Sequence, residues 1–451
     1  MVARTWRLTL LVGLFVGLFA VPAAGHNPEH HEDARLAFED TLLASTLGAQ
    51  QASLGGFPCE NGMAGPYPCK NVDLESFVPL PVLGGATGND IWGWTDPKSK
   101  REFAIMGTST STGFVEVTDP KNPVLIGTLP TRGVPDYVLW RDVKVDNHFA
   151  FIVSEISGSG LQVFDLRRLL TAGPTPTVFA EDAAYDEFSY AHNISINTTT
   201  DFAYVVGSNT CGVNGENGGL HMVDISQPLQ PRFAGCATVD DFSGAEPNNY
   251  VHDVECVVYR GPDADYQGRE ICFGSNENVV AIYDVTDKAN PRVISTTGYP
   301  TATYTHQGAL TPDQRHFLFG DELDEQGNGQ NTTTYVLDAL DLDDPPTPGA
   351  HLQPTRSIDH NQYVHGNRTY QSNYTAGLRI LQYDDASLAN ARLDEVAFFD
   401  VAPAVDIAEF AGTWSNYRFP RTGTVVVSTI ENQVSGLFVL RPQLGGGPKP
   451  K

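Results

Sequence analysis

The sequence predicts an all-β protein, a seven-bladed β-propeller with a short N-terminal helical segment. Apolar, β-branched segments alternate with Gly, Asn, Asp and Pro turns through most of the 451 residues. A phrase of three strand-like segments recurs seven times, and one further strand-like segment precedes the first copy. A pair of β-sandwich domains is the alternative fold that these strands allow.

The first 25 residues have the order of a secretory signal peptide. Arg4 and Arg7 precede an apolar run, residues 8–20, and small residues follow it. These thirteen apolar residues fall short of the roughly 20 that a membrane-spanning helix needs. We therefore expect residues 1–25 to be removed rather than to serve as a membrane anchor.

Residues 26–58 read differently from the rest of the chain. Leucine and phenylalanine recur between residues 36 and 47 at approximately helical spacing, which predicts a short helix followed by a linker.

The repeats occupy residues 59–442. Each opens on a short strand that starts with a polar or aromatic residue, and these openings follow one another in steps of 49 to 60 residues. The seven opening residues are Trp92, Arg141, His192, His252, His306, His360 and Trp414. A second strand is almost wholly hydrophobic, as in residues 149–154, which is typical of strands covered on both faces. A third strand commonly closes on Asp, as in residues 161–165.

Outer strands and ring closure complete the predicted propeller. Asx-Pro turns lead from a third strand into an outer strand at residues 124–127 and 292–295. The last repeat ends at Arg441 after three strands, so we expect residues 72–78 to supply its fourth strand and remove an open sheet edge. Residues 443–451 read as a flexible Gly- and Pro-rich tail.

Six cysteines follow the signal segment, an even number that suits three disulfides in an oxidising compartment. Fifteen pairings are possible on paper. Proximity in the chain favours Cys59 with Cys69 and Cys256 with Cys272, which leaves Cys211 with Cys236. No CxxC pair occurs, so a cysteine metal site is disfavoured.

Three third-strand phrases resemble LVIVD repeats, namely residues 115–119, 222–226 and 282–286. The stretch from Cys59 to Leu74 is similar to the entry of the choice-of-anchor B family, and the resemblance extends to Pro442. It implies an exported protein whose C-terminal anchor varies between members, and it implies no established reaction. This chain departs from that pattern because its tail shows no recognisable anchor.

Composition excludes several functions. With 28 basic and 54 acidic residues the formal charge is −26, so we expect no binding to nucleic-acid phosphates. No GxSxG elbow, P-loop, HExxH or dinucleotide fingerprint is present, which disfavours the commonest hydrolases, nucleotide-binding proteins and metalloproteases. No segment after the signal peptide is expected to span a membrane.

The chemistry is expected where the repeat openings converge. The innermost strand of each blade lines the central channel, so His192, His252, His306 and His360 should meet at one rim. Other polar residues open or follow these strands, namely Arg141, Asp142, Asn193, Asp253, Gln307 and Asn361. Loops after the second strands should reach the same rim and bring Asn209, Asn276, Asp321, Glu322 and Asp324.

Three interpretations of these residues remain open. The four histidines are candidate metal ligands, with Asp253, Asp321 and Glu322 as weaker candidates that would widen the choice from Zn²⁺ to Mn²⁺ or Ca²⁺. Alternatively the histidines bond backbone groups or water around the channel, or act as acids and bases without a metal. The acidic loop 321–329 offers calcium-like oxygen donors but lacks the EF-hand order, so we interpret it as a solvated loop.

We therefore expect a secreted or cell-surface binding or scaffolding propeller that presents one rim to a protein or glycan partner. Seven aromatic residues on the loops and first strands motivate this hypothesis: Trp92, Trp94, Trp140, Tyr190, Tyr250, Tyr304 and Trp414. The alternative is a metal-dependent polysaccharide hydrolase or lyase that uses the rim histidines, by analogy with histidine-containing propeller lyases.

Overall fold

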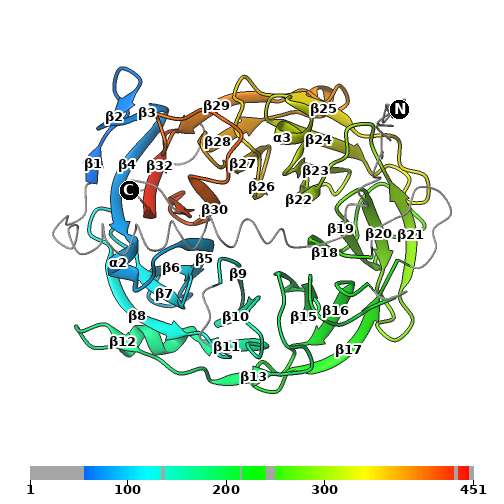
Figure 1. The fold of residues 1–451 in the computed structure, drawn as a ribbon, viewed down its shortest axis with the longest axis horizontal. Helices are drawn as coiled ribbons and strands as arrows, with labels where there is room; N and C mark the ends of the chain where they lie inside the picture. The colour runs from blue at the N-terminus through cyan, green and yellow to red at the C-terminus, as the bar shows by residue number, and fades with distance from the viewer. Residues whose placement is uncertain (1–54, 134–137, 214–215, 240–248, 431–434, 446–451) are drawn as a thin grey trace, which may run out of the picture.

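Seven β-sheets surround a central channel in the computed structural model, which describes residues 55–133, 138–213, 216–239, 249–430 and 435–445 (Figure 1). The predicted seven-bladed propeller is therefore confirmed, and the pair of sandwiches is wrong. The expected signal peptide, the N-terminal helix and the last residues of the tail lie outside the described residues.

Blades 1 to 4 follow one another in chain order, each from the channel outward. Blade 1 consists of β5 (Gly88–Thr95), β6 (Glu102–Thr108), β7 (Ser111–Glu116) and β8 (Val124–Pro130), with β12 (Thr177–Val178) added at its edge. Blade 2 consists of β9 (Arg141–Asp146), β10 (Phe149–Ser154), β11 (Leu161–Asp165) and β13 (Ala183–Tyr185), and the 3-10 helix η1 (Leu166–Thr171) follows β11. Blade 3 consists of β14 (Asn193–Asn197), β15 (Phe202–Val206), β16 (Leu220–Asp224) and β17 (Arg232–Ala237). Blade 4 consists of β18 (Asp253–Val258), β19 (Glu270–Ser275), β20 (Val280–Asp284) and β21 (Arg292–Thr297).

Blades 5 to 7 complete the circle. Blade 5 consists of β22 (Thr305–Leu310), β23 (His316–Asp321), β24 (Thr333–Asp338) and β25 (Gly349–Leu352), with helix α3 (Asp324–Asn328) between β23 and β24. Blade 6 consists of β26 (Gln362–His365), β27 (Arg368–Asn373), β28 (Gly377–Gln382) and β29 (Asp394–Phe399), with α4 (Asp385–Leu388) after β28 and the outer strands β3 (Tyr67–Lys70) and β2 (Met63–Ala64). Blade 7 consists of β30 (Thr413–Arg418), β31 (Val425–Thr429) and β32 (Gly436–Pro442), completed by β4 (Val72–Pro79) and β1 (Gly55–Phe57), and α2 (Leu80–Leu83) follows β4.

The chain closes its own circle through β4. This strand pairs antiparallel with β32, from Gly436 opposite Pro79 to Pro442 opposite Val72, with a bulge between Val439 and Leu440. Figure 1 shows the blue N-terminal strand beside the red C-terminal strand. The prediction that residues 72–78 complete the last blade is confirmed. β1 extends the same sheet, so the propeller strands begin at Gly55, four residues before the predicted boundary.

Hydrophobic contacts between blades hold the circle together. Most second strands are buried along their whole length, as in β6 and β10, because both faces of each sheet meet a neighbouring blade. Between blades 1 and 2, for example, the rings of Phe114 and Phe164 stack with centroids 4.6 Å apart. The outer strands are partly exposed, as in β8 and β21. A rigid wall of strands therefore fixes every side chain that faces the channel.

All three predicted disulfides are confirmed. Cys59–Cys69 fastens the N-terminal loop to the edge of blade 6, and Cys211–Cys236 lies in blade 3. Cys256 and Cys272 are directly opposite each other on β18 and β19 and are joined in blade 4. Three disulfides are compatible with an extracellular protein. Within the described ranges no helix has the length and apolar character to cross a membrane.

Candidate ligand site at the mouth of the channel

Four imidazoles lie side by side at one end of the channel, which we call the mouth. His192, His252, His306 and His360 come from the starts of the first strands of blades 3 to 6, and their successive ring centroids are 4.3, 4.1 and 4.4 Å apart. All four side chains are buried. The structure thus brings together the four histidines that the repeat spacing placed at one rim.

In two of these rings, Nδ1 is hydrogen-bonded to a backbone oxygen of the next blade. Nδ1 of His252 lies 3.0 Å from the backbone oxygen of His306, and Nδ1 of His360 contacts the backbone oxygen of Trp414. Each contact joins one blade to the next. A carbonyl oxygen only accepts hydrogen bonds, so Nδ1 is the protonated nitrogen in both rings. Nε2 of each neutral ring therefore keeps a free lone pair.

Glu322 faces two of the imidazoles. It directly follows β23, and its carboxylate oxygens lie 3.5 Å from Nε2 of His306 and 3.5 Å from Nε2 of His360. The hydroxyl of Tyr374 donates to Oε1 of Glu322 at 2.6 Å. Ligand atoms of His306, Glu322 and His360 all lie within 4.8 Å of one another, close enough to hold one metal ion. Nδ1 of His306 has no hydrogen-bond partner among the described residues.

Burial disfavours the charged forms of His252, His306, His360 and Glu322. It lowers the pKa of His252 and of His306 well below the usual value, and the neighbouring imidazoles lower both further. Burial also lowers the pKa of His360 to about 3 and raises the pKa of Glu322 to about 7. Neutral imidazoles with free lone pairs are the form that binds metal ions.

A second acid at the mouth, Glu155, belongs to blade 2. Nδ1 of His192 donates to its Oε1 at 2.6 Å. The sequence analysis missed Glu155, although it directly follows the second strand of its blade, as Glu322 does in blade 5. The same position in the repeat was therefore the signal that could have identified it.

The predicted rim residues mostly connect blades. Oδ2 of Asp142 accepts from the backbone N–H of Ile194, and Oε1 of Gln307 accepts from that of Gln362. The side-chain amide of Asn193 donates to the backbone oxygen of His252. Each of these bonds joins the first strands of successive blades, so these side chains fix the channel wall.

Arg141 and Asn361 have different surroundings. Arg141 is buried against blade 1, where its guanidinium donates to the backbone oxygen of Thr108 and the hydroxyl of Thr131. The backbone oxygen of Asn361 accepts from Ser372, within blade 6. In the described part of the chain its side-chain oxygen has no partner.

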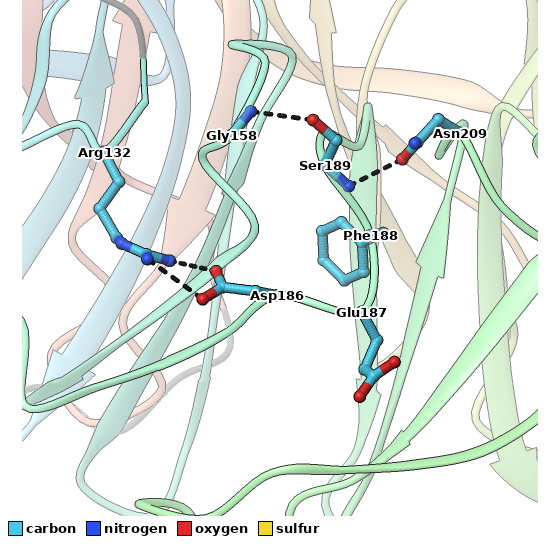
Figure 2. A pocket seen from close by; sticks show the side chains of 7 residues that line it. All are labelled: Arg132, Gly158, Asp186, Glu187, Phe188, Ser189 and Asn209. Atoms are coloured by element: carbon cyan, nitrogen blue, oxygen red, sulfur yellow. Dashed lines mark hydrogen bonds and ion pairs between the residues drawn. The ribbon is translucent and has the colours of Figure 1, made fainter.

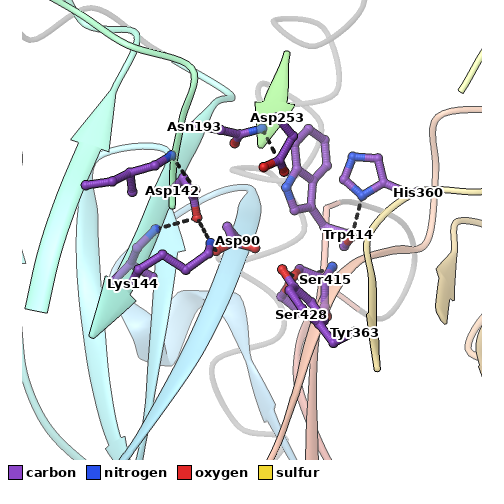
Figure 3. Close-up of polar contacts among 12 residues, drawn as sticks. Asp90, Asp142, Lys144, Asn193, Asp253, His360, Tyr363, Trp414, Ser415 and Ser428 are labelled. Atoms are coloured by element: carbon purple, nitrogen blue, oxygen red, sulfur yellow. Dashed lines mark hydrogen bonds and ion pairs between the residues drawn. The ribbon is translucent and has the colours of Figure 1, made fainter. Parts of the chain in front are cut away.

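Asp253 lies on the wall of a cavity deeper in the channel. This cavity of about 350 Å³ is lined by residues of the first strands of six blades and their ends. Burial raises the pKa of Asp253 to about 7, against the opposing effect of Lys144. Figure 3 shows the side chain beside Asn193.

Lys144 provides a positive charge on the same wall. Its Nζ lies 2.5 Å from Asp142 and 3.3 Å from Asp90 (Figure 3). Burial opposes the charge of Lys144, but these two carboxylates outweigh it and raise its pKa. Burial raises the pKa of Asp90, against the opposing effect of Lys144. This arrangement reads as a buried ion pair of Lys144 with Asp142, with Asp90 protonated beside it.

Asp321 is not placed as a ligand at the mouth. Its carboxylate accepts hydrogen bonds from the hydroxyl of Tyr299 and the backbone N–H groups of Thr303 and Tyr304. It therefore fixes the loop that leads into blade 5. In the acidic loop that follows, Asp324 and Glu325 of α3 are buried whereas residues 326–329 are exposed, so the interpretation as a solvated loop is wrong for these two acids.

The aromatic residues expected to present contact area are mostly covered. Only Tyr190, with 38% of its surface exposed, counts as exposed. The others are partly or wholly buried: Trp92, Trp94, Trp140, Tyr250, Tyr304 and Trp414. Several pack against the imidazoles instead, as Trp414 does against His360 at 4.5 Å.

A pocket of about 470 Å³ lies between blades 2 and 3, and Figure 2 shows the residues that line it. Arg132 and Asp186 form an ion pair across it, and Glu187, Ser189 and Asn209 add polar groups. Its loops, which supply Gly158 and Asn209, leave the same ends of the second strands as Glu155 and Glu322, so the pocket lies on the same face as the mouth.

Comparisons with known proteins find only distant structural likenesses. No family model matches the chain, and no curated protein matches it. The β-propeller domain of Cps50 (Swd1) from Myceliophteria thermophila is 11% identical, with a TM-score of 0.48 over 79% of this chain and 98% of that chain. Hydrazine synthase from Kuenenia stuttgartiensis is 16% identical, with a TM-score of 0.47 over 76% of this chain and 95% of that chain. Such distant likeness carries no functional argument, and the resemblance to choice-of-anchor B proteins stays a prediction.

Proposed function

We propose that this protein is a secreted or cell-surface propeller that binds a glycan at the mouth, and that a divalent transition metal held by His306, Glu322 and His360 forms part of the site. A propeller in general suits a binding or scaffolding role. The signal-like residues 1–25 and the three disulfides support export. The LVIVD-like phrases support placing the chain with the choice-of-anchor B proteins.

One observation carries the proposal: above the raised pKa of Glu322, about 7, the carboxyl is ionised and two hydrogen-bond acceptors face each other at the mouth. Nε2 of His360 is unprotonated because Nδ1 donates to Trp414, yet Nε2 lies 3.5 Å from Oε1 of Glu322. The same oxygen already accepts from Tyr374. A cation between the lone pair and the carboxylate turns this repulsion into ligation.

The donor set selects the kind of metal. Two imidazole nitrogens and one carboxylate suit Zn²⁺ or Mn²⁺, whereas Ca²⁺ takes oxygen ligands only. The hydrogen bond from Nδ1 of His360 to the backbone oxygen of Trp414 holds the ring so that Nε2 faces the metal position, as such bonds do for histidine ligands in known zinc sites. With three protein side chains on the metal, one coordination position stays open for an oxygen atom of the bound molecule.

A glycan fits this face better than a protein does. Protein interfaces are enriched in aromatic residues, but only Tyr190 of the candidate aromatics is exposed. The polar pocket of Arg132, Asp186 and Asn209 lies on the same face and offers hydrogen bonds to hydroxyl groups. The open metal position would take a hydroxyl or a carboxylate of the sugar.

Calorimetric titration of chelator-treated full-length protein with ZnCl₂ tests the metal. We expect one Zn²⁺ per chain, and His306→Gln/His360→Gln should weaken binding at least about a hundredfold. The matched control is His221→Gln, since both nitrogens of buried His221 already bond hydroxyl groups. An unchanged affinity in the double variant, with circular dichroism showing an intact fold, would contradict the proposal. Titration of the zinc-loaded protein with an acidic oligosaccharide then tests the partner, and binding without zinc would contradict the role given to the metal.

A polysaccharide hydrolase or lyase is the second candidate, and the pair of His192 and Glu155 favours it. The 2.6 Å contact with Glu155 orients the ring of His192, whose other nitrogen can act as a base. The ring of His252 lies between His192 and the metal ligand His306. A metal here supplies Lewis acidity. Release of reducing ends or of unsaturated sugars by the zinc-loaded protein, lost in His192→Gln with zinc still bound, would support an enzyme. If the protein releases no product from the acidic polysaccharides tested, the result contradicts the enzyme and favours the binding function.

A further inference from the structure

A second group of metal-ligating side chains lies next to the mouth but shares no residue with it. We call the carboxylates of Asp324, Glu325 and Asp359 the acidic triad. Asp324 and Glu325 begin helix α3 of blade 5, and Asp359 lies in the segment that enters blade 6. An oxygen from each residue lies within 4.8 Å of the others.

The triad is buried almost completely. Asp324, Glu325 and Asp359 expose 0%, 3% and 4% of their surface. A carbon side chain at Gly320 would meet Oδ2 of Asp359 at 1.5 Å, so only glycine at that position leaves room for the carboxylate. The absence of a side chain at Gly320 in blade 5 therefore allows the carboxylate of Asp359 to lie buried between blades 5 and 6.

Each acid leaves one oxygen unsatisfied. Oδ2 of Asp324 accepts from the hydroxyl of Tyr335 at 2.7 Å and from the amide of Gln330, and Oε1 of Glu325 accepts from the backbone N–H of Thr333. Oδ1 of Asp324, Oε2 of Glu325 and Oδ1 of Asp359 accept no hydrogen bond from an N–H or hydroxyl group of the described residues, and the carboxyl groups of Asp324 and Glu325 lie within hydrogen-bond reach of each other. No ion pair found within the described ranges involves the triad.

Three buried carboxylates without a counter-charge are far too costly to remain ionised, since each ion loses its hydration. A bound cation supplies the missing charge and satisfies the three free oxygens together. Only oxygen donors are present, which is the preference of Ca²⁺, and water or carbonyl oxygens can complete its six to eight ligands. We infer that the acidic triad binds one calcium ion, which fastens the α3 loop of blade 5 to the segment entering blade 6.

Protonation is the competing way to bury three carboxyl groups, and the experiment must separate the two. Full-length protein treated with EGTA is titrated with CaCl₂ at pH 7.5, and its melting temperature is measured with EGTA, CaCl₂ or MgCl₂. We expect one calcium per chain and a melting temperature that EGTA lowers and CaCl₂ restores. No calcium uptake together with a melting temperature indifferent to EGTA would overturn the inference in favour of protonated acids.

Neutral variants locate the ion. Asp324→Asn/Glu325→Gln/Asp359→Asn removes three negative charges with little change in shape, so it should fold, bind no calcium and ignore EGTA. The matched control neutralises a second cluster, Asp263, Asp341 and Asp343, whose ligand atoms also lie within 4.8 Å of one another. Asp263 and Asp341 accept backbone N–H bonds, Asp343 accepts from the hydroxyl of Tyr266, and Asp341 and Asp343 are exposed to solvent. This control should keep the full calcium response. Calcium binding that persists in the first variant or disappears in the second would refute the location.

Two further measurements test the calcium site even if the triple variant does not fold. Asp359→Asn alone should weaken calcium binding at least about tenfold, because affinity follows the charge of the ligands. Terbium bound in place of calcium should luminesce on excitation of tyrosine, since Tyr335 donates directly to Asp324. Terbium luminescence that CaCl₂ does not quench, or an Asp359→Asn affinity equal to that of the unmodified chain, would also refute the inference. His306→Gln/His360→Gln should leave the calcium response unchanged, so the calcium and zinc proposals fail separately.

Discussion

Replacement of His221 by glutamine should make the protein less sensitive to acid. His221 lies on β16 with 2% of its surface exposed, and its ring nitrogens bond the hydroxyls of Tyr185 at 2.8 Å and Thr210 at 2.9 Å. Phe188, Phe233 and Tyr185 pack around the ring. Burial lowers the pKa of this histidine as it does for His252, His306 and His360, but His221 has no free nitrogen to offer a ligand.

The magnitude follows from two pKa values. Burial lowers the pKa of His221 to about 4 in the folded protein, whereas the unfolded chain has about 6.5. The unfolded state therefore binds the proton more readily, so stability is complete above pH 6.5 and is lost as the pH falls from 6.5 towards 4. The loss is about 1.4 kcal/mol per pH unit in that window, which amounts to about 2 kcal/mol at pH 5 relative to pH 8.

Equilibrium urea unfolding at pH 8 and pH 5 measures this loss. His221→Gln keeps one donor and one acceptor but does not titrate, so its decrease in free energy of unfolding between the two pH values should be smaller by about 2 kcal/mol. Other groups titrate equally in both proteins and cancel in the comparison. An equal decrease in both proteins would show that burial does not hold His221 neutral, and would weaken the same reasoning for His252, His306 and His360.

Two substitutions test the packing that positions the mouth. Phe77→Ala on β4 removes a ring that is 6% exposed and 4.7 Å from the ring of Phe438, so denaturant unfolding should show a loss of about 3–5 kcal/mol. Val82→Ala, 49% exposed, should cost less than about 0.5 kcal/mol, and equal losses would contradict closure through β4. Lys144→Met leaves the buried Asp142 carboxylate without its ion partner and should cost about 3–5 kcal/mol. Adding Asp142→Asn should recover part of this loss, and no recovery would mean that the pairing is not what the first change removed.

The sequence predicts most of the fold because its repeats have a regular period. The second strand of blade 6 is harder to recognise, since β27 reads Arg-Thr-Tyr-Gln-Ser-Asn rather than as a hydrophobic run. Gln371 and Asn373 are nevertheless buried. The amide of Gln371 bonds Gln353 and Thr334, and the amide nitrogen of Asn373 donates to Gln353. Hydrophobicity does not predict a strand whose burial depends on side-chain hydrogen bonds from two other segments.

The candidate site could be predicted only in part. Register places the four histidines at one rim, since each occupies the same position in its repeat. The register does not predict which ring nitrogen is protonated. In His360 and His252 this depends on the backbone oxygens of Trp414 and His306, each 54 residues later in the chain. The burial of Asp324 and Glu325 could not be predicted from the sequence either, because it depends on contact with Asp359 of the next repeat.

Anomalous diffraction at the zinc absorption edge, from crystals grown with ZnCl₂, tests the central claim most directly. The account predicts one strong peak at the mouth, about 2.0–2.2 Å from Nε2 of His306, Nε2 of His360 and a carboxylate oxygen of Glu322. A mouth without a peak, or zinc bound only at surface sites away from these three side chains, would contradict it.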